Sequence, residues 1–88
     1  MPLYAAHYET ACITRQHLEQ LARRLHAAVA DCRPDRFFCS LTGGHLVWLF
    51  VGPDRPSVVR WLEGLQMGNY QWLARIDYEG EGEIMRDA

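Results

Sequence analysis

Residues 45–51, HLVWLFV, form an apolar run that begins after a single histidine. A strand with one face in water alternates apolar and polar side chains, because successive side chains point to opposite faces of the sheet. This run does not alternate, so it predicts a central strand with both faces buried. Each face of the sheet that contains it then needs a cover. One face carries Leu46, Trp48 and Phe50, and the other carries His45, Val47, Leu49 and Val51.

Strands and helices follow in a regular order around this run. Residues 3–9, short and aromatic-rich, predict a first strand. Residues 14–32 carry apolar side chains at three- and four-residue spacing, which predicts a helix that ends before the next proline. Residues 36–42 predict a second strand. Gly43 and Gly44 then join it to the apolar run in a hairpin, because tight hairpin turns need positive φ angles.

The C-terminal half completes the pattern. Residues 57–67 predict a second helix, and residues 70–78 alternate as a fourth strand with one wetter face. The resulting order, β-α-β-β-α-β, is that of the split-βαβ, ferredoxin-like fold. We therefore predict an α+β sandwich in which two helices cover one face of a four-stranded antiparallel sheet. We expect residues 1–79 to form a single domain and residues 80–88 to form an acidic tail that frays or makes a short extension.

Charge and cysteine content exclude several classes of function. The chain has 88 residues and a formal net charge of -2, whereas nucleic acids and anionic membranes attract basic surfaces. Residues 36–42 also lack the Gly-Phe signature of RNA-recognition modules, which share this strand order. The longest apolar run is too short to span a bilayer, and the N-terminus lacks the pattern of a signal peptide. Three cysteines without a C-x-x-C pair fit neither a disulfide framework nor a zinc finger. We expect a cytoplasmic protein with reduced thiols and with no nucleic-acid or membrane partner.

The second face of the apolar strand needs a cover that the two helices cannot supply. Exposing three or four large apolar side chains together leaves a patch that monomeric proteins rarely show. Most soluble oligomers are symmetric, and the two-fold dimer is the commonest of them. We therefore predict a homodimer in which the open sheet faces meet. The alternative is that the C-terminal tail or a chain terminus folds over the face.

Three segments resemble a known superfamily in the order of their elements. They are MPLYAAHYE, ITRQHLEQLARRLH and HLVWLFVGPDRPSVVRWLEGL, which cover most of the chain. The chain resembles the small ferredoxin-like proteins that assemble as dimeric α/β barrels. That superfamily includes antibiotic-biosynthesis-type monooxygenases, muconolactone-isomerase-like enzymes and a group that contains a bacterial nickel-binding protein. In the nickel-binding group a histidine commonly follows the second helix, where this chain has Asn69 in the sequence MGNYQW.

Four side chains are candidate ligand-binding residues. His7 lies in the predicted first strand, near the predicted dimer interface. Two interpretations are open: a ligand or proton-transfer group in the cavity, and a hydrogen-bonded interior histidine. Trp48 and Trp72 line an apolar cavity or pack in the core. Arg75, in the last strand, binds a carboxylate or pairs with an acidic neighbour on the surface. Of the other histidines, His17 and His26 are expected on the helix surface, and His45 beside the glycine turn.

The leading expectation is a small-ligand or metal-binding homodimer, with the pocket between the sheet and its cover. The sequence identifies no catalytic residue, no cofactor and no particular metal. The resemblance implies an alternative, a cofactor-independent monooxygenase or isomerase in which His7 shuttles a proton. A third possibility is a structural or regulatory interaction module.

Overall fold

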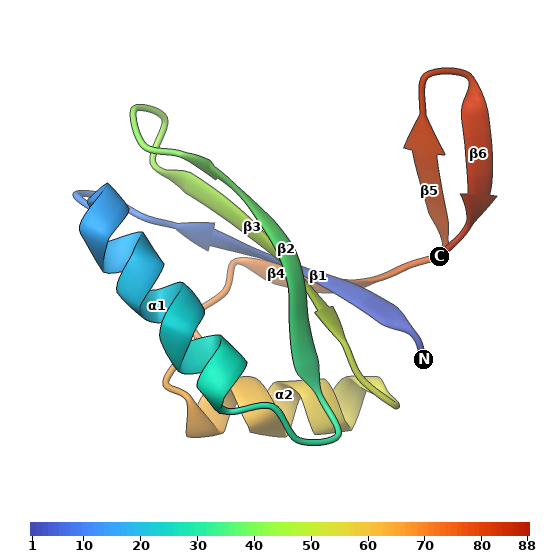
Figure 1. The fold of residues 1–88 in the computed structure, drawn as a ribbon, viewed down its shortest axis with the longest axis horizontal. Helices are drawn as coiled ribbons and strands as arrows, with labels where there is room; N and C mark the ends of the chain where they lie inside the picture. Colours follow the sequence, from blue (N-terminus) through green and yellow to red (C-terminus); the bar gives the residue numbers. More distant parts are fainter.

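The fold is a four-stranded antiparallel sheet with two helices on one face, described here for all 88 residues by a computed structural model (Figure 1). The strand order in the sheet is β2-β3-β1-β4, so the apolar strand is central, as predicted. This small α+β fold is compatible with a ferredoxin-like architecture. The elements are β1 (Leu3–Glu9), α1 (Arg15–Ala27), β2 (Arg33–Ser40), β3 (His45–Val51), α2 (Arg55–Gly64), β4 (Trp72–Ile76), β5 (Tyr78–Glu81) and β6 (Ile84–Asp87).

Short polar side chains begin both helices. The Thr14 hydroxyl accepts a hydrogen bond from the backbone N–H of His17 at 3.1 Å, and an Asp54 carboxylate oxygen accepts one from Ser57 at 2.8 Å. Each satisfies an N–H group that has no partner inside the helix. The hydrogen bond to Ser57 also lowers the pKa of Asp54. Both helices therefore start where the sequence provides a cap.

The first helix is shorter than its apolar spacing predicts. It ends at Ala27, whereas the spacing continues to residue 32. The indole N–H of Trp61 on α2 donates a hydrogen bond to the Ala28 carbonyl at 2.9 Å. A side chain of the second helix therefore supplies the donor for a carbonyl group at the end of α1. The chain then turns and starts β2 at Arg33, three residues earlier than predicted.

The predicted glycine hairpin joins β2 to β3. Gly44 has a φ of +70°, and its N–H donates to the Ser40 carbonyl at 2.9 Å, which closes the turn. The register of β2 on β3 shifts between Pro34 and Phe37, which marks a bulge in this edge strand. The hairpin thus sets which side chains of β2 and β3 share a face.

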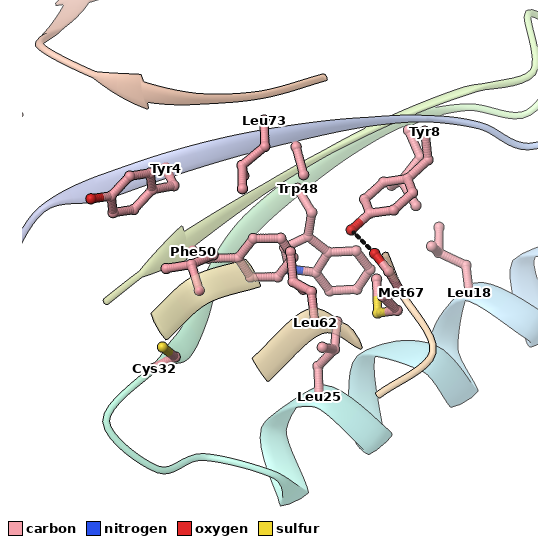
Figure 2. Packing of buried hydrophobic residues seen from close by; sticks show 13 residues of the cluster. Tyr4, Tyr8, Leu18, Leu25, Cys32, Trp48, Phe50, Leu62, Met67 and Leu73 are labelled. Carbon is pink, nitrogen blue, oxygen red and sulfur yellow. Dashed lines mark hydrogen bonds between the residues drawn. The ribbon is translucent and has the colours of Figure 1, made fainter. Parts of the chain in front are cut away.

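The main core lies between the sheet and the helices. Trp48 and Phe50 of β3 project into it, with their ring planes 3° apart and their centroids 6.2 Å apart (Figure 2). Leu25 of α1 and Leu62 of α2 pack into the same core and are fully buried. The Trp48 side of the apolar run is therefore the side covered by the helices.

The last twelve residues form an ordered element that the sequence did not predict. The predicted strand over residues 70–78 is limited to Trp72–Ile76, and a separate β5–β6 hairpin follows. The hairpin stands clear of the sheet on the side away from the helices (Figure 1). Its residues are exposed apart from Glu79, which is half-buried. No helix has the length and apolar character that crossing a membrane requires.

Candidate functional site

The sheet face opposite the helices, called here the open face, is apolar over much of its area. A second core cluster of Leu3, Ala5, Leu49 and Val51 lies on it, with Val47 and Ile76 packed at its margin. Its four central members are already buried within the single chain. Both faces of β3 are therefore apolar, as the uninterrupted run predicts.

The chain's own C-terminal segment crosses one end of the open face. Glu79 on β5 forms an ion pair with Arg36 on β2, although β5 follows β4 at the opposite edge of the sheet. This base of the hairpin lies near the end of the sheet where Leu3 pairs with Ile76. At this end of the open face, the segment that follows the fourth strand therefore lies over the sheet. This was the alternative to a cover supplied by a second chain.

The other end of the open face is uncovered and holds three aromatic rings. His7 of β1 and Trp72 of β4 are direct cross-strand partners, and His45 of β3 is the diagonal neighbour of His7. The His7 and Trp72 ring centroids are 5.6 Å apart with planes inclined by 23°. The His7 and His45 centroids are 5.2 Å apart at 27°. The three rings form a stacked row across β3, β1 and β4.

The two imidazoles are within hydrogen-bonding distance of each other. Nε2 of His7 lies 3.1 Å from Nδ1 of His45. Such a bond needs one N–H donor and one bare nitrogen, so it requires at least one neutral ring. Nδ1 of His7 is buried and has no hydrogen-bond partner. A buried polar atom without a partner is uncommon, and it distinguishes His7 from an ordinary interior histidine.

An apolar rim borders the His7–His45 pair. Phe38 of β2, the cross-strand partner of Val47, is 62% exposed. An open hollow of about 290 Å³ runs beside it, lined by Phe38, Cys39, Ser40, His45 and Val47. Trp72, on the other side of His7, is 47% exposed. The uncovered end of the open face therefore carries the polar His7–His45 pair, with exposed apolar side chains on both sides of it.

The four predicted site residues do not all meet. His7 and Trp72 lie together on the open face. Trp48 is 1% exposed on the opposite side of β3, in the core beneath the helices. Arg75 pairs in register with Tyr4, whose side chain faces the helices, and it forms no ion pair. His45 was not among the predicted site residues, and it comes beside His7 through the pairing of β1 with β3, in which Glu9 opposes His45 and His7 opposes Val47.

A second hollow of about 300 Å³ lies between α1, the end of β1 and the loop after α2. Two of its polar side chains, Tyr8 and Arg24, donate hydrogen bonds to the backbone. The Tyr8 hydroxyl donates to the Met67 carbonyl at 2.9 Å (Figure 2), and burial raises the pKa of Tyr8 well above its ordinary value. Arg24 donates to the Leu65 carbonyl. Tyr8 therefore stays protonated at neutral pH and serves as an anchor of the loop.

Of the three cysteines, Cys39 alone lines one of the two hollows, the one beside His45. Cys12 is exposed, Cys39 is half-buried and Cys32 is fully buried. Burial, reinforced by Asp31, raises the pKa of the Cys32 thiol to about 11, so the reactive thiolate is scarce at neutral pH. No group of three or more His, Cys, Asp or Glu side chains that could hold a metal ion occurs within the single chain.

Comparison with known proteins assigns the chain to no family. No protein-family model matches it, and searches of curated proteins and of solved structures return no match. The side chains of the open face are therefore the features of this chain that indicate a function.

Proposed function

We propose that this chain is a homodimeric binding protein for a divalent transition-metal ion, and that His7 and His45 are its ligands. The observation that carries the proposal is the 3.1 Å separation between Nε2 of His7 and Nδ1 of His45. Two nitrogens bound to one ion at about 2.0–2.1 Å are about 2.9 Å apart at a right angle and about 3.4 Å apart at a tetrahedral angle. The spacing of the pair falls between these values. The two rings must then turn so that both lone pairs point at one ion rather than at each other.

The chemistry of the ligands limits the choice of metal. Imidazole nitrogen suits zinc, copper, nickel and iron, whereas magnesium and calcium prefer oxygen ligands. The ion binds in place of the proton that the two rings share. Protons compete for the same nitrogens, so acidification releases the ion.

A second copy of the chain completes the coordination in this proposal. One chain offers two nitrogens, and a tetrahedral site needs four ligands. A two-fold axis through facing sheets brings a second histidine pair into the same interface. The exposed Phe38 and Trp72 beside the pair support such a contact, because apolar side chains around an uncovered face favour association.

The test is a titration of reduced, full-length protein with Co²⁺, followed by its visible absorption and by competition with Zn²⁺. We expect His7→Ala and His45→Ala each to weaken binding by at least tenfold, since even the loss of a residue that only orients a ligand costs about 10–100-fold in affinity. His17→Ala and His26→Ala are matched controls, because both residues lie exposed on α1.

The controls separate a built site from chance binding. Unchanged affinity in His7→Ala, or equal losses in the His17→Ala control, would rule out the proposed site. Loss confined to the His7 and His45 variants would support it.

A second candidate function uses the same pair without a metal. Two hydrogen-bonded imidazoles can relay a proton from one ring to the other. This is the proton-shuttle role of His7 in a cofactor-independent isomerase or monooxygenase. Under this alternative the wild-type protein binds no metal, and neither does His45→Ala. The substitution instead removes turnover of a planar substrate that stacks on Trp72.

A further inference from the structure

The two faces of the β5–β6 hairpin differ in their surroundings. Tyr78 opposes Asp87, and Gly80 opposes Met85, so these four residues share one face. Glu79 opposes Arg86 on the other face and also pairs with Arg36 of β2. Glu79 therefore connects the hairpin to the chain's own sheet. On the first face, Tyr78 is 61% and Met85 71% exposed, and neither has a partner in its own chain that covers it.

The hairpin has little support from its own chain. An isolated two-stranded hairpin is at best marginally stable in water. Its ionic tie to the sheet is the Arg36–Glu79 pair, in which the Arg36 side chain is half exposed to solvent. The pair raises the pKa of Arg36, but exposed ion pairs contribute little to stability. A further contact is needed to hold an ordered hairpin in this position.

The length of the hairpin strands is close to the distance between two stacked sheets. Strands of four residues extend about 13 Å, and stacked sheets lie about 10 Å apart. The hairpin rises on the open-face side of the sheet (Figure 1). A second sheet laid on the open face would therefore lie beside the hairpin.

Charge also favours a second copy as the occupant. Residues 77–88 hold five carboxylates and one arginine, a net charge of -4, whereas residues 1–76 hold eight arginines and six carboxylates, a net charge of +2. The acidic hairpin of one copy is thus complementary to the sheet domain of another. Arg33 offers one such contact, because it pairs with Val51 at the margin of the open face, is exposed and forms no ion pair.

From these observations we infer that the β5–β6 hairpin is an arm that clasps a second copy of this chain, with Tyr78 and Met85 as its contact residues. The inference rests on the homodimer in the proposed function and adds the segment that secures it. Each copy gives one arm and receives one, as a two-fold contact requires. The open faces meet in the middle, and the arms close the two sides.

Sedimentation of the full-length chain tests the arm. We expect Tyr78→Ser combined with Met85→Ser to raise the dimer dissociation constant at least tenfold, while the circular dichroism spectrum stays that of the wild type. Val29→Ser is the matched control, because Val29 is 52% exposed but follows α1, away from the hairpin. We expect the control to leave the dissociation constant unchanged.

Isotope-filtered NMR supplies the second readout. In a mixture of ¹³C-labelled and unlabelled chains, we expect nuclear Overhauser effects from the Met85 methyl group to protons of the unlabelled copy. A dimer with an unchanged dissociation constant in the double variant and without these effects overturns the arm while leaving the dimer intact. A wild-type protein that is monomeric overturns both the arm and the homodimer. The Co²⁺ titration of His7→Ala tests the metal site independently of these results.

Discussion

Tyr8 is the side chain that joins the first strand to the loop after α2. Its hydroxyl donates to the Met67 carbonyl at 2.9 Å, in a buried position. Tyr8→Phe leaves that carbonyl without its partner, so we expect the free energy of unfolding to fall by about 1–2 kcal/mol. Urea denaturation followed by circular dichroism measures the change. Tyr70→Phe removes a hydroxyl that forms no hydrogen bond within the chain and should stay within about 0.5 kcal/mol of the wild type. Equal effects of the two substitutions would show that the hydrogen bond contributes nothing.

At the level of single residues, the sequence does not determine which face of the sheet a side chain occupies. His7 and Trp72 lie side by side on the open face. Both sides of β3 are apolar, so hydrophobic pattern alone does not decide which side meets the helices, and Trp48 was assigned to the pocket for that reason. His45 was missed because its role depends on a cross-strand register. That register belongs to the pairing of β1 with β3, two strands that are distant in the sequence, and no local pattern around His45 indicates it.

Among the elements, the connection from β3 to α2 has the tightest steric requirement. A Cβ atom at Gly52 would lie 2.6 Å from a Val58 methyl group and 3.0 Å from the Cys32 sulfur. Both neighbours are fully buried, so the core must shift, and we expect Gly52→Ala to destabilise the fold by about 1–3 kcal/mol. Gly64→Ala is the control, since a Cβ atom there meets nothing within 4 Å at the end of α2. We expect it to be neutral or to stabilise by up to about 1 kcal/mol, because alanine favours helix over glycine. Thermal unfolding of the two variants provides the comparison, and a Gly52→Ala protein as stable as the Gly64→Ala protein would refute the packing argument.

The order of elements was predictable, and their ends were less so. Periodicity identified both helices, four strands and the glycine hairpin, because each depends on local spacing. The end of α1 was overestimated because the indole of Trp61, distant in sequence, satisfies the Ala28 carbonyl there. The C-terminal hairpin was read as a tail because its strands are short and acidic. Its turn signal is Gly82, whose φ of +61° is the conformation that glycine adopts most readily.

For the whole molecule, the proposed homodimer predicts a role for the open face. Phe38 is 62% exposed on that face, far from the helices' core. We expect Phe38→Asp to shift the protein from dimer to monomer in light scattering at micromolar concentration, because it places a charge in an apolar contact. The same substitution at Val29, after α1, should leave the dimer intact. Dimers of equal strength in both variants would show that the open face is not the interface.

The bulge between Pro34 and Phe37 limits the addition of further chains to the edge of the sheet. β2 forms one outer edge of the sheet, and an exposed edge can act as a template on which further chains add without limit. The bulge interrupts the row of backbone donors and acceptors along this edge, and Pro34 supplies no donor at all. At the other edge, β4 is only five residues long. Neither border supports a long ribbon of added strands, so this small chain is protected against fibril growth at the two places where a sheet protein is most exposed to it.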